Sequence, residues 1–180
     1  MARNPSMDAE PALKVLRQVA KEKNLPAPTE ELGSGSEGIV FATTDPTMVC
    51  RVGTQEKVFD LLEWQESNAV VRVHYLEKMM AEDNDGSETK VVVSWQELVD
   101  EHIEGYFYRK YKGDKETQDK ILGALSGLYH VDRKKLKILK EFEETEFLAE
   151  AIENGMPTGD LDLSSNLGMT SDNRVVAFDL

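Results

Sequence analysis

The final stretch of the chain gathers the polar side chains that could do chemistry. Asp160 and Asp162 stand in a polar segment, Asn166 follows them, and Asp179 ends a strand-like run that starts at Val175. Carboxylate and amide oxygens are hard ligands, which suit magnesium better than zinc. The same residue types also serve turns, because Asp caps turns and Asn tolerates a left-handed backbone. The segment therefore predicts either a cation-binding loop or ordinary turns.

A second feature with chemical potential is a glycine-rich segment far upstream. Gly33, Gly35, Gly38 and Val40 fit the pattern G-x-G-x-x-G-x-V at every position. Glycines let backbone N–H groups approach phosphate oxygens without a Cβ clash. A Rossmann loop leads into a helix, whereas Ile39-Val-Phe is strand-like, so the pattern favours a phosphate-binding hairpin. A Gly/Ser linker that matches by chance is the alternative.

Together the two segments resemble the protein-kinase-like superfamily, in particular its aminoglycoside phosphotransferase and small atypical kinase type. Gly159-Asp160-Leu161 is similar to the Gly-Asp-Leu form of its small-molecule kinases, and Asn166 and Asp179 are thirteen positions apart, as in protein kinases. The segment from Leu98 to Gly105 resembles the hinge whose backbone groups bind adenine. The resemblance runs from about residue 32 to 180, and its two ends carry the specific motifs.

The resemblance implies that the first half of the chain holds ATP. The glycine loop, with Val40 behind it, would cover the phosphates. Arg51 lies in the strand-like run 48–52, where the family has a phosphate-binding lysine, and would contact the phosphates. A glutamate from the next helix would orient this cation. Glu56 is the favoured candidate, with Asp60 and Glu63 as alternatives.

For the second half, the resemblance implies the metal ligands and the proton acceptor. Asn166 and Asp179 would hold Mg²⁺. Asp160 would accept the proton of the acceptor hydroxyl group, and Asp162, four residues before Asn166, is its rival.

Four departures from the family pattern bear on activity. Arg51 replaces a lysine, and the two cations are not interchangeable. Thr158 stands where the family usually has His, and six positions rather than five separate Asp160 from Asn166. Nothing follows Leu180, so we expect a truncated C-lobe whose last strand is covered by helices of residues 115–154 or by a second copy in a homodimer.

Composition restricts the class of protein and its partners. The 180 residues carry 34 acids and 21 bases, a net charge of −13, which opposes non-specific nucleic-acid binding. There is no run of 18 apolar residues and no signal-peptide pattern, so we expect a cytoplasmic protein without a membrane partner. Cys50 is the lone cysteine, which rules out an internal disulfide and a cysteine-rich metal site.

The basic run 133–140 predicts a solvated helix face or a docking patch for an acidic partner.

The pattern of residues predicts an α+β protein with two lobes. An N-terminal helical extension covers residues 1–28, a β-rich N-lobe with one helix covers 29–104, and a minimal, mainly helical C-lobe covers 105–180. The expected elements are a helix at 8–23, a hairpin at 39–44 and 48–52, a helix at 55–66, strands at 70–74, 91–94 and 97–99, a polar turn at 81–88, helices over most of 115–154, and a final strand.

We therefore expect a kinase-like phosphotransferase that binds ATP with Mg²⁺ and transfers the γ-phosphoryl group to a hydroxyl of a protein or small molecule. The alternative is a catalytically impaired pseudokinase that acts as a binding or inhibitor protein.

Overall fold

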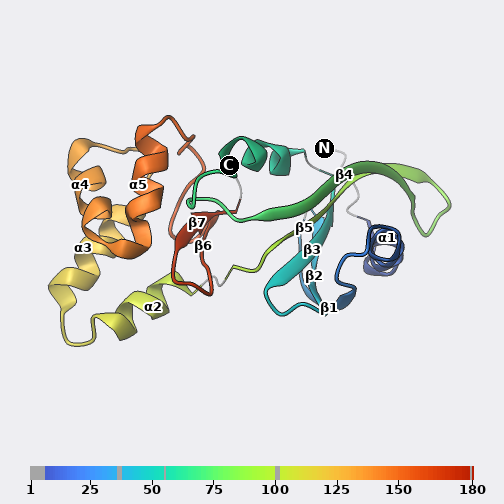
Figure 1. Ribbon diagram of the computed structural model, residues 1–180, viewed down its shortest axis with the longest axis horizontal. Helices are drawn as coiled ribbons and strands as arrows, with labels where there is room; N and C mark the ends of the chain where they lie inside the picture. Colours follow the sequence, from blue (N-terminus) through green and yellow to red (C-terminus); the bar gives the residue numbers. More distant parts are fainter. Residues whose placement is uncertain (1–6, 36–37, 55, 100–101, 179) are drawn as a thin grey trace. The chain divides into compact units, whose positions relative to one another are not determined.

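The computed structural model describes residues 7–35, 38–54, 56–99, 102–178 and 180. The chain forms two compact units (Figure 1): unit 1 comprises Met1–Glu56 and Arg72–Leu98, and unit 2 comprises Lys57–Val71 and Val99–Leu180. Unit 1 is built on an antiparallel sheet and unit 2 on helices, so the predicted α+β class is confirmed. No helix within the described ranges combines the length and apolar character that crossing a membrane requires.

Unit 1 contains a five-stranded antiparallel sheet. Its strands are β1 (Pro28–Gly35), β2 (Gly38–Thr43), β3 (Met48–Gly53), β4 (Val73–Glu82) and β5 (Glu88–Glu97), in the order β1-β2-β3-β5-β4. The predicted hairpin at 39–52 is confirmed as β2–β3. Asp45 fixes its turn, because its Oδ1 accepts hydrogen bonds from the Thr47 backbone N–H at 2.9 Å and the Thr47 hydroxyl at 2.7 Å.

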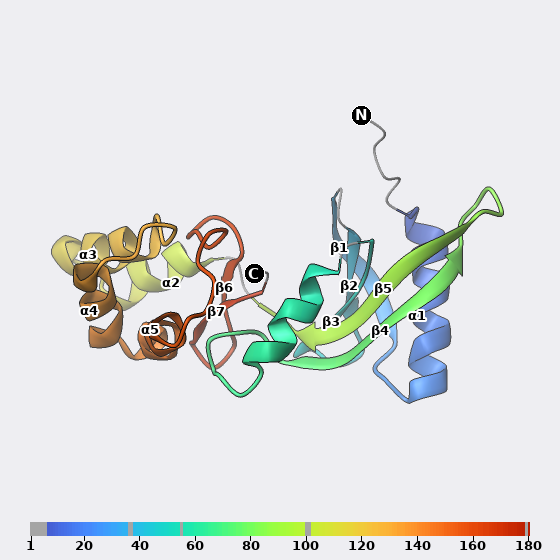
Figure 2. The ribbon, with the colours of Figure 1, turned by 90° about the horizontal axis from the view of Figure 1, so that it is seen from above.

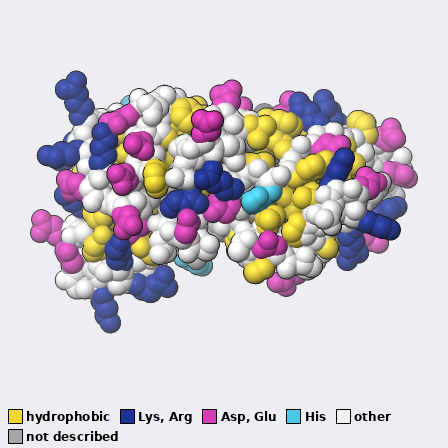
Figure 3. All heavy atoms as spheres, viewed as in Figure 1, with side chains coloured by type: hydrophobic (Ala, Val, Ile, Leu, Met, Phe, Trp, Pro, Cys, Tyr) yellow, Lys and Arg dark blue, Asp and Glu magenta, His cyan; other side chains and the backbone are white. Residues whose placement is uncertain are grey.

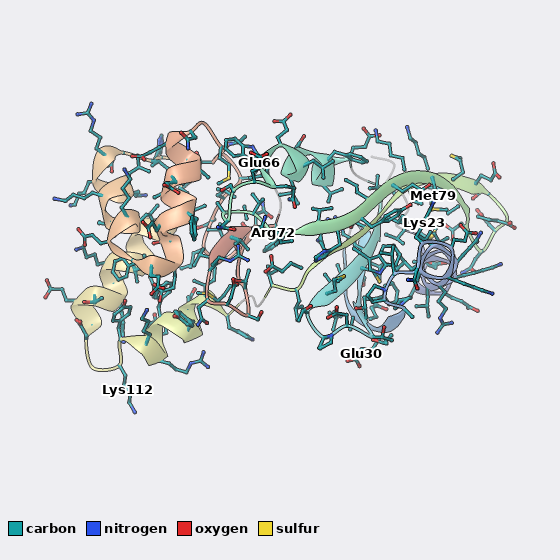
Figure 4. All side chains as sticks on the ribbon, in the orientation of Figure 1. Lys23, Glu30, Glu66, Arg72, Met79 and Lys112 are labelled. Carbon is teal, nitrogen blue, oxygen red and sulfur yellow. The ribbon has the colours of Figure 1, made fainter. Side chains whose placement is uncertain are left out.

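Helix α1 (Ala9–Lys23) covers one face of this sheet (Figure 2). Alternate strand residues, including Phe41, Cys50 and Trp95, pack with the apolar stripe of α1 in one core. Met79 of β4 lies on the same side of the sheet (Figure 4). The intervening residues point to the opposite face, which therefore carries Arg51.

Unit 2 contains helices α2 (Ile103–Lys110), α3 (Lys115–Leu125), α4 (Arg133–Glu141) and α5 (Glu146–Glu153), with the short 3-10 helix η2 (Glu143–Thr145) before α5. Helix α4 packs against both α3 and α5. The predicted helices in 115–154 are thus confirmed. Asp114 and Asp132 begin α3 and α4 by accepting hydrogen bonds from the backbone N–H groups of Thr117 and Lys135.

A buried carboxylate ties α2 to η2. The Glu144 side chain is only 3% exposed, and its Oε1 accepts hydrogen bonds from the Tyr106 hydroxyl at 2.8 Å and from Lys110 Nζ. Burial alone would raise the pKa of Glu144, but these two donors outweigh it and lower the pKa below the ordinary 4.5. The carboxylate is therefore charged at neutral pH and holds the two elements together.

Four expected elements differ in the structure, and one of them is the strand at 97–99, which does not form because β5 ends at Glu97. The helix expected at 55–66 is a 3-10 helix, η1 (Lys57–Trp64), and Glu56 precedes it. The strand expected at 70–74 starts only at Val73, because residues 69–71 pair instead with β7 (Val175–Ala177) of the final segment. The glycine of the hinge-like segment, Gly105, lies inside α2, and residues 100–101 of that segment are outside the described residues.

Candidate functional site

The glycine-rich segment forms the end of a hairpin in unit 1. Gly33 and Gly35 lie on β1 and Gly38 lies on β2, with Gly35 opposite Gly38 and Gly33 opposite Val40. The segment therefore leads into a strand and not into a helix, which confirms the predicted hairpin. Residues 36–37, at its tip, are outside the described residues.

The three glycines differ in what the fold demands of them. A Cβ at Gly38 would overlap the carbonyl oxygen of Val52 and lie 2.9 Å from the Cα of Gly53, on the neighbouring strand β3. A Cβ at Gly33 or Gly35 would meet no described atom within 4 Å. The close approach of β2 and β3 thus explains Gly38, whereas packing does not explain Gly33 or Gly35. Those two positions leave open space beside the backbone, which suits the approach of a phosphate.

Arg51 and Val40 lie on one face of the sheet. They are cross-strand partners on β3 and β2, and both are half-buried. Residues directly opposite in an antiparallel pair point to the same side. The predicted phosphate-binding cation therefore lies on the same sheet face as the valine that ends the glycine motif, and α1 covers the other face.

Glu56 pairs with two lysines of the sheet. Its Oε1 lies 3.0 Å from Nζ of Lys78 and 3.7 Å from Nζ of Lys90. The hydrogen bond and charge of Lys78, followed by the weaker effect of Lys90, lower the pKa of Glu56. Glu56 thus bonds to β4 and β5 within unit 1, a role that the sequence pattern did not indicate.

In unit 2, the acidic segment forms a tight turn held by backbone and side-chain hydrogen bonds. Asp162 and Ser165 exchange two backbone hydrogen bonds of 3.1 Å. The Asp162 Oδ1 accepts from the Leu163 backbone N–H at 2.7 Å. Asn166 has a left-handed φ of 62°, and its Nδ2 donates to the Asp160 carbonyl oxygen at 2.9 Å. The alternative assigned from sequence, turn capping by Asp162 and a left-handed Asn166, therefore describes the local structure.

The final hairpin brings Asn166 next to the end of β7. Strand β6 (Leu167–Met169) follows Asn166 directly and pairs with β7. The Phe178 backbone N–H donates to the Asn166 carbonyl oxygen at 3.1 Å. Asp179, the predicted metal ligand, lies outside the described residues. Among the residues that are described, no group of three or more His, Cys, Asp or Glu has an arrangement that could hold a metal ion.

The two rival proton acceptors line different hollows of unit 2. Asp160 is exposed and lines a hollow of about 450 Å³ together with Asp60, Glu63 and Trp64 of η1. Asp162 lines a separate hollow of about 540 Å³ that also includes Tyr129 and Lys135. The fold therefore places Asp160, the acceptor expected from the sequence, and its rival Asp162 in different surroundings. Trp64 and Tyr129 had no signal in the sequence, because only folding brings them beside this segment.

Comparison with known proteins gives structural likenesses but no match in sequence. No protein-family model matches the chain, and no curated protein matches it in sequence. A solved structure with a similar course of the chain is the kinase PK-1 of Cydia pomonella granulovirus, with 15% sequence identity and a TM-score of 0.45. The match covers 92% of this chain and 57% of that kinase. A likeness of this degree does not establish a family.

Proposed function

We propose that this protein is a kinase-like phosphotransferase that binds ATP with Mg²⁺ and transfers the γ-phosphoryl group to a hydroxyl acceptor. The observation that carries the proposal is the glycine hairpin. It matches G-x-G-x-x-G-x-V in full, it leads into a strand, and the packing of the fold does not require Gly33 or Gly35. Arg51, on the face of the sheet away from α1, would contact the phosphates.

The ligands of the metal would be Asn166 and Asp179. An amide oxygen and a carboxylate are hard donors that fit Mg²⁺. The hydrogen bond between the Phe178 N–H and the Asn166 carbonyl supports the pairing, because it holds the residue before Asp179 against Asn166. Bound Mg²⁺ would neutralise charge that develops on the transferred phosphoryl group.

Asp160 is the better candidate for the proton acceptor. Its side chain is exposed and lines the hollow of about 450 Å³, large enough to admit part of an acceptor. The Asp162 carboxylate is half-buried and already accepts the Leu163 N–H within its own turn. Using the Asp162 carboxylate at a substrate would therefore remove this hydrogen bond from the turn.

Nucleotide binding and turnover test the proposal together. ATP should raise the melting temperature in a thermal-shift assay, and Mg²⁺ should increase the shift. Asp179→Ala should lower Mg²⁺-dependent ATP turnover more than about a hundredfold, since one charge-stabilising ligand is lost. Asp119→Ala, an exposed aspartate of α3, is the matched control and should leave turnover unchanged. Full turnover in Asp179→Ala would overturn the assignment.

A specific observation favours a second candidate, a pseudokinase that binds nucleotide without transferring phosphate. Asp162 and Asn166 are both engaged in local hydrogen bonds, and Arg51 replaces the family's lysine. In that case ATP would shift the melting temperature, but no turnover above that of Asp179→Ala would be measured.

A further inference from the structure

Helix α4 exposes three cations that have no ion-pair partner among the described residues. Arg133, Lys134 and Lys137 are exposed, and none of them forms an ion pair with any described residue. Their spacing of one and four places them on one side of the helix. We call these three residues the basic surface. Lys and Arg side chains project from the protein over this helix (Figure 3).

The other cations of α4 have structural partners. Lys135 Nζ donates to the carbonyl oxygens of Ser126 and Gly127 at 3.0 and 2.9 Å, where α3 ends. Lys140 Nζ forms an ion pair with Glu153 of α5. The structure therefore accounts for two of the five basic residues in α4 and leaves the basic surface unexplained.

The position of the basic surface in the helix makes it costly. Arg133 and Lys134 are in the first turn of α4, where the helix dipole is positive, and that turn contains no acidic residue. Cations at a helix N-terminus are unfavourable, whereas acids there are stabilising. A local rule broken without a structural gain is typical of residues kept for interaction.

Helix α4 borders the acidic segment through Lys135, which lines a hollow together with Asp162. Tyr129, four residues before Arg133, is 64% exposed. Tyr129 also lines this hollow of about 540 Å³, as do Leu163 and Ser164. Exposed tyrosines are typical of the residues that dominate binding at protein interfaces.

We propose that the basic surface binds an acidic segment of a protein acceptor, so that the acceptor's hydroxyl-bearing residue is held near the turn at 160–166. This substrate class rests on the proposed phosphotransferase function, but the binding does not. Three exposed cations attract an acidic chain over about a Debye length. A nucleic acid is the less suitable partner, because the net charge of −13 repels a long polyanion.

Peptide binding tests the proposal directly. The probe is a fluorescently labelled peptide with one serine flanked on both sides by glutamates, and fluorescence anisotropy measures its affinity. Peptides with glutamine or lysine in place of the glutamates are the comparison. The acidic peptide should bind at least about tenfold more tightly than the glutamine peptide, and added salt should weaken it.

A triple charge reversal, Arg133→Glu with Lys134→Glu and Lys137→Glu, should lower that affinity about tenfold or more. The control reverses three exposed cations of α1, Lys14→Glu with Arg17→Glu and Lys21→Glu, which changes the net charge equally. It should bind like the native protein. Thermal melting checks folding, and the α4 variant should melt no lower, because glutamates suit the start of a helix.

The outcomes separate the docking proposal from the proposed function. Equal binding of acidic and glutamine peptides, or native-like binding by the α4 variant, would overturn docking. Tighter binding of a single-stranded RNA of the same length than of the acidic peptide would also overturn it, in favour of a nucleic-acid surface. Selective peptide binding with no phosphate transfer to its serine would leave docking supported and count against the phosphotransferase.

Discussion

The glycine hairpin of unit 1 and the acidic turn of unit 2 both match motifs, but the fold explains them to different degrees. In the hairpin, packing requires Gly38 and leaves Gly33 and Gly35 without a structural reason. In the turn, Asp162 and Asn166 each stabilise the local structure, through side-chain hydrogen bonds and, at Asn166, a left-handed backbone. Such roles are common to many turns and need no function. A motif residue is therefore stronger evidence of function where the fold does not itself demand that residue.

Because of this difference, the glycine hairpin is stronger evidence of function than the acidic turn. The hairpin supports nucleotide binding through the glycines that packing does not need. The turn supports catalysis only through residues whose structural and chemical roles overlap, so variants have to separate those roles.

Gly38→Ala should have the largest effect on stability. The new Cβ would overlap the Val52 carbonyl oxygen and press on Gly53, both backbone groups of the sheet. Neither group can move without breaking the β2–β3 pairing, so we expect a loss of about 3 kcal/mol in the free energy of unfolding. Urea denaturation measures it. A variant as stable as the native protein would contradict the structural role of Gly38. Phosphate binding would then be the remaining explanation for glycine at this position.

Acid should unfold the unit that carries the acidic turn before the unit that carries the glycine hairpin. Glu144, buried in unit 2, has a lowered pKa. Its contribution to stability is present above its ordinary pKa of 4.5 and is lost as pH falls through its lower folded pKa. In unit 1, Glu56 also has a lowered pKa, but it is exposed and contributes little.

Each unit has one tryptophan, which allows the two to be followed separately. Trp95 is fully buried in unit 1, and Trp64 lies in unit 2. In a Trp64→Phe variant, fluorescence reports on unit 1, while the helical circular dichroism reports mainly on unit 2. Glu144→Gln should lower the stability of unit 2 by about 2 kcal/mol at neutral pH and reduce its sensitivity to acid. A single transition at every pH would mean that the units do not unfold independently.

Much of the fold could be predicted where a local pattern decides it. The apolar stripe of 8–23 predicted α1, and the two β-rich runs around Asp45-Pro46 predicted β2–β3. The length of β4 was not predicted, because Glu77 and Lys78 interrupt the apolar alternation. This edge strand tolerates charges because one side has no neighbouring strand.

The sequence was sufficient to predict which residues belong to the candidate site. It was not sufficient to predict which of them the fold itself requires. The need for glycine at 38 depends on how closely β3 approaches, which no local pattern records. The pairing of residues 69–71 with β7 joins segments about a hundred positions apart, and it prevents the strand expected at 70–74. Long-range contacts of this kind also decide which hollow each aspartate lines.

Two substitutions at Asn166 should separate its role in the turn from a role at the metal. Asn166→Gly keeps the left-handed backbone at φ 62°, so the free energy of unfolding should change little. Asn166→Ala should lower it by about 1 kcal/mol, because alanine is strained there. If Asn166 holds Mg²⁺, both variants should lose ATP turnover alike. Turnover that follows stability, retained in glycine and lost in alanine, would mean that the residue serves only the turn.

Gly33→Ala and Gly35→Ala should have the smallest effect on stability and still impair nucleotide binding. With no described atom within 4 Å of the added Cβ, the free energy of unfolding should change by no more than about 0.5 kcal/mol. A methyl group beside the backbone would nevertheless obstruct the approach of phosphate oxygens, so the thermal shift with ATP should decrease.

Gly86→Ala, in the turn between β4 and β5, is a poor control because its φ of 79° strains alanine. Gly123→Ala in α3 is the better one, since the site is open and helical. If both hairpin variants bind ATP like the Gly123→Ala control, the open backbone of the hairpin has no part in binding phosphate. The glycine hairpin would then no longer be evidence of nucleotide binding.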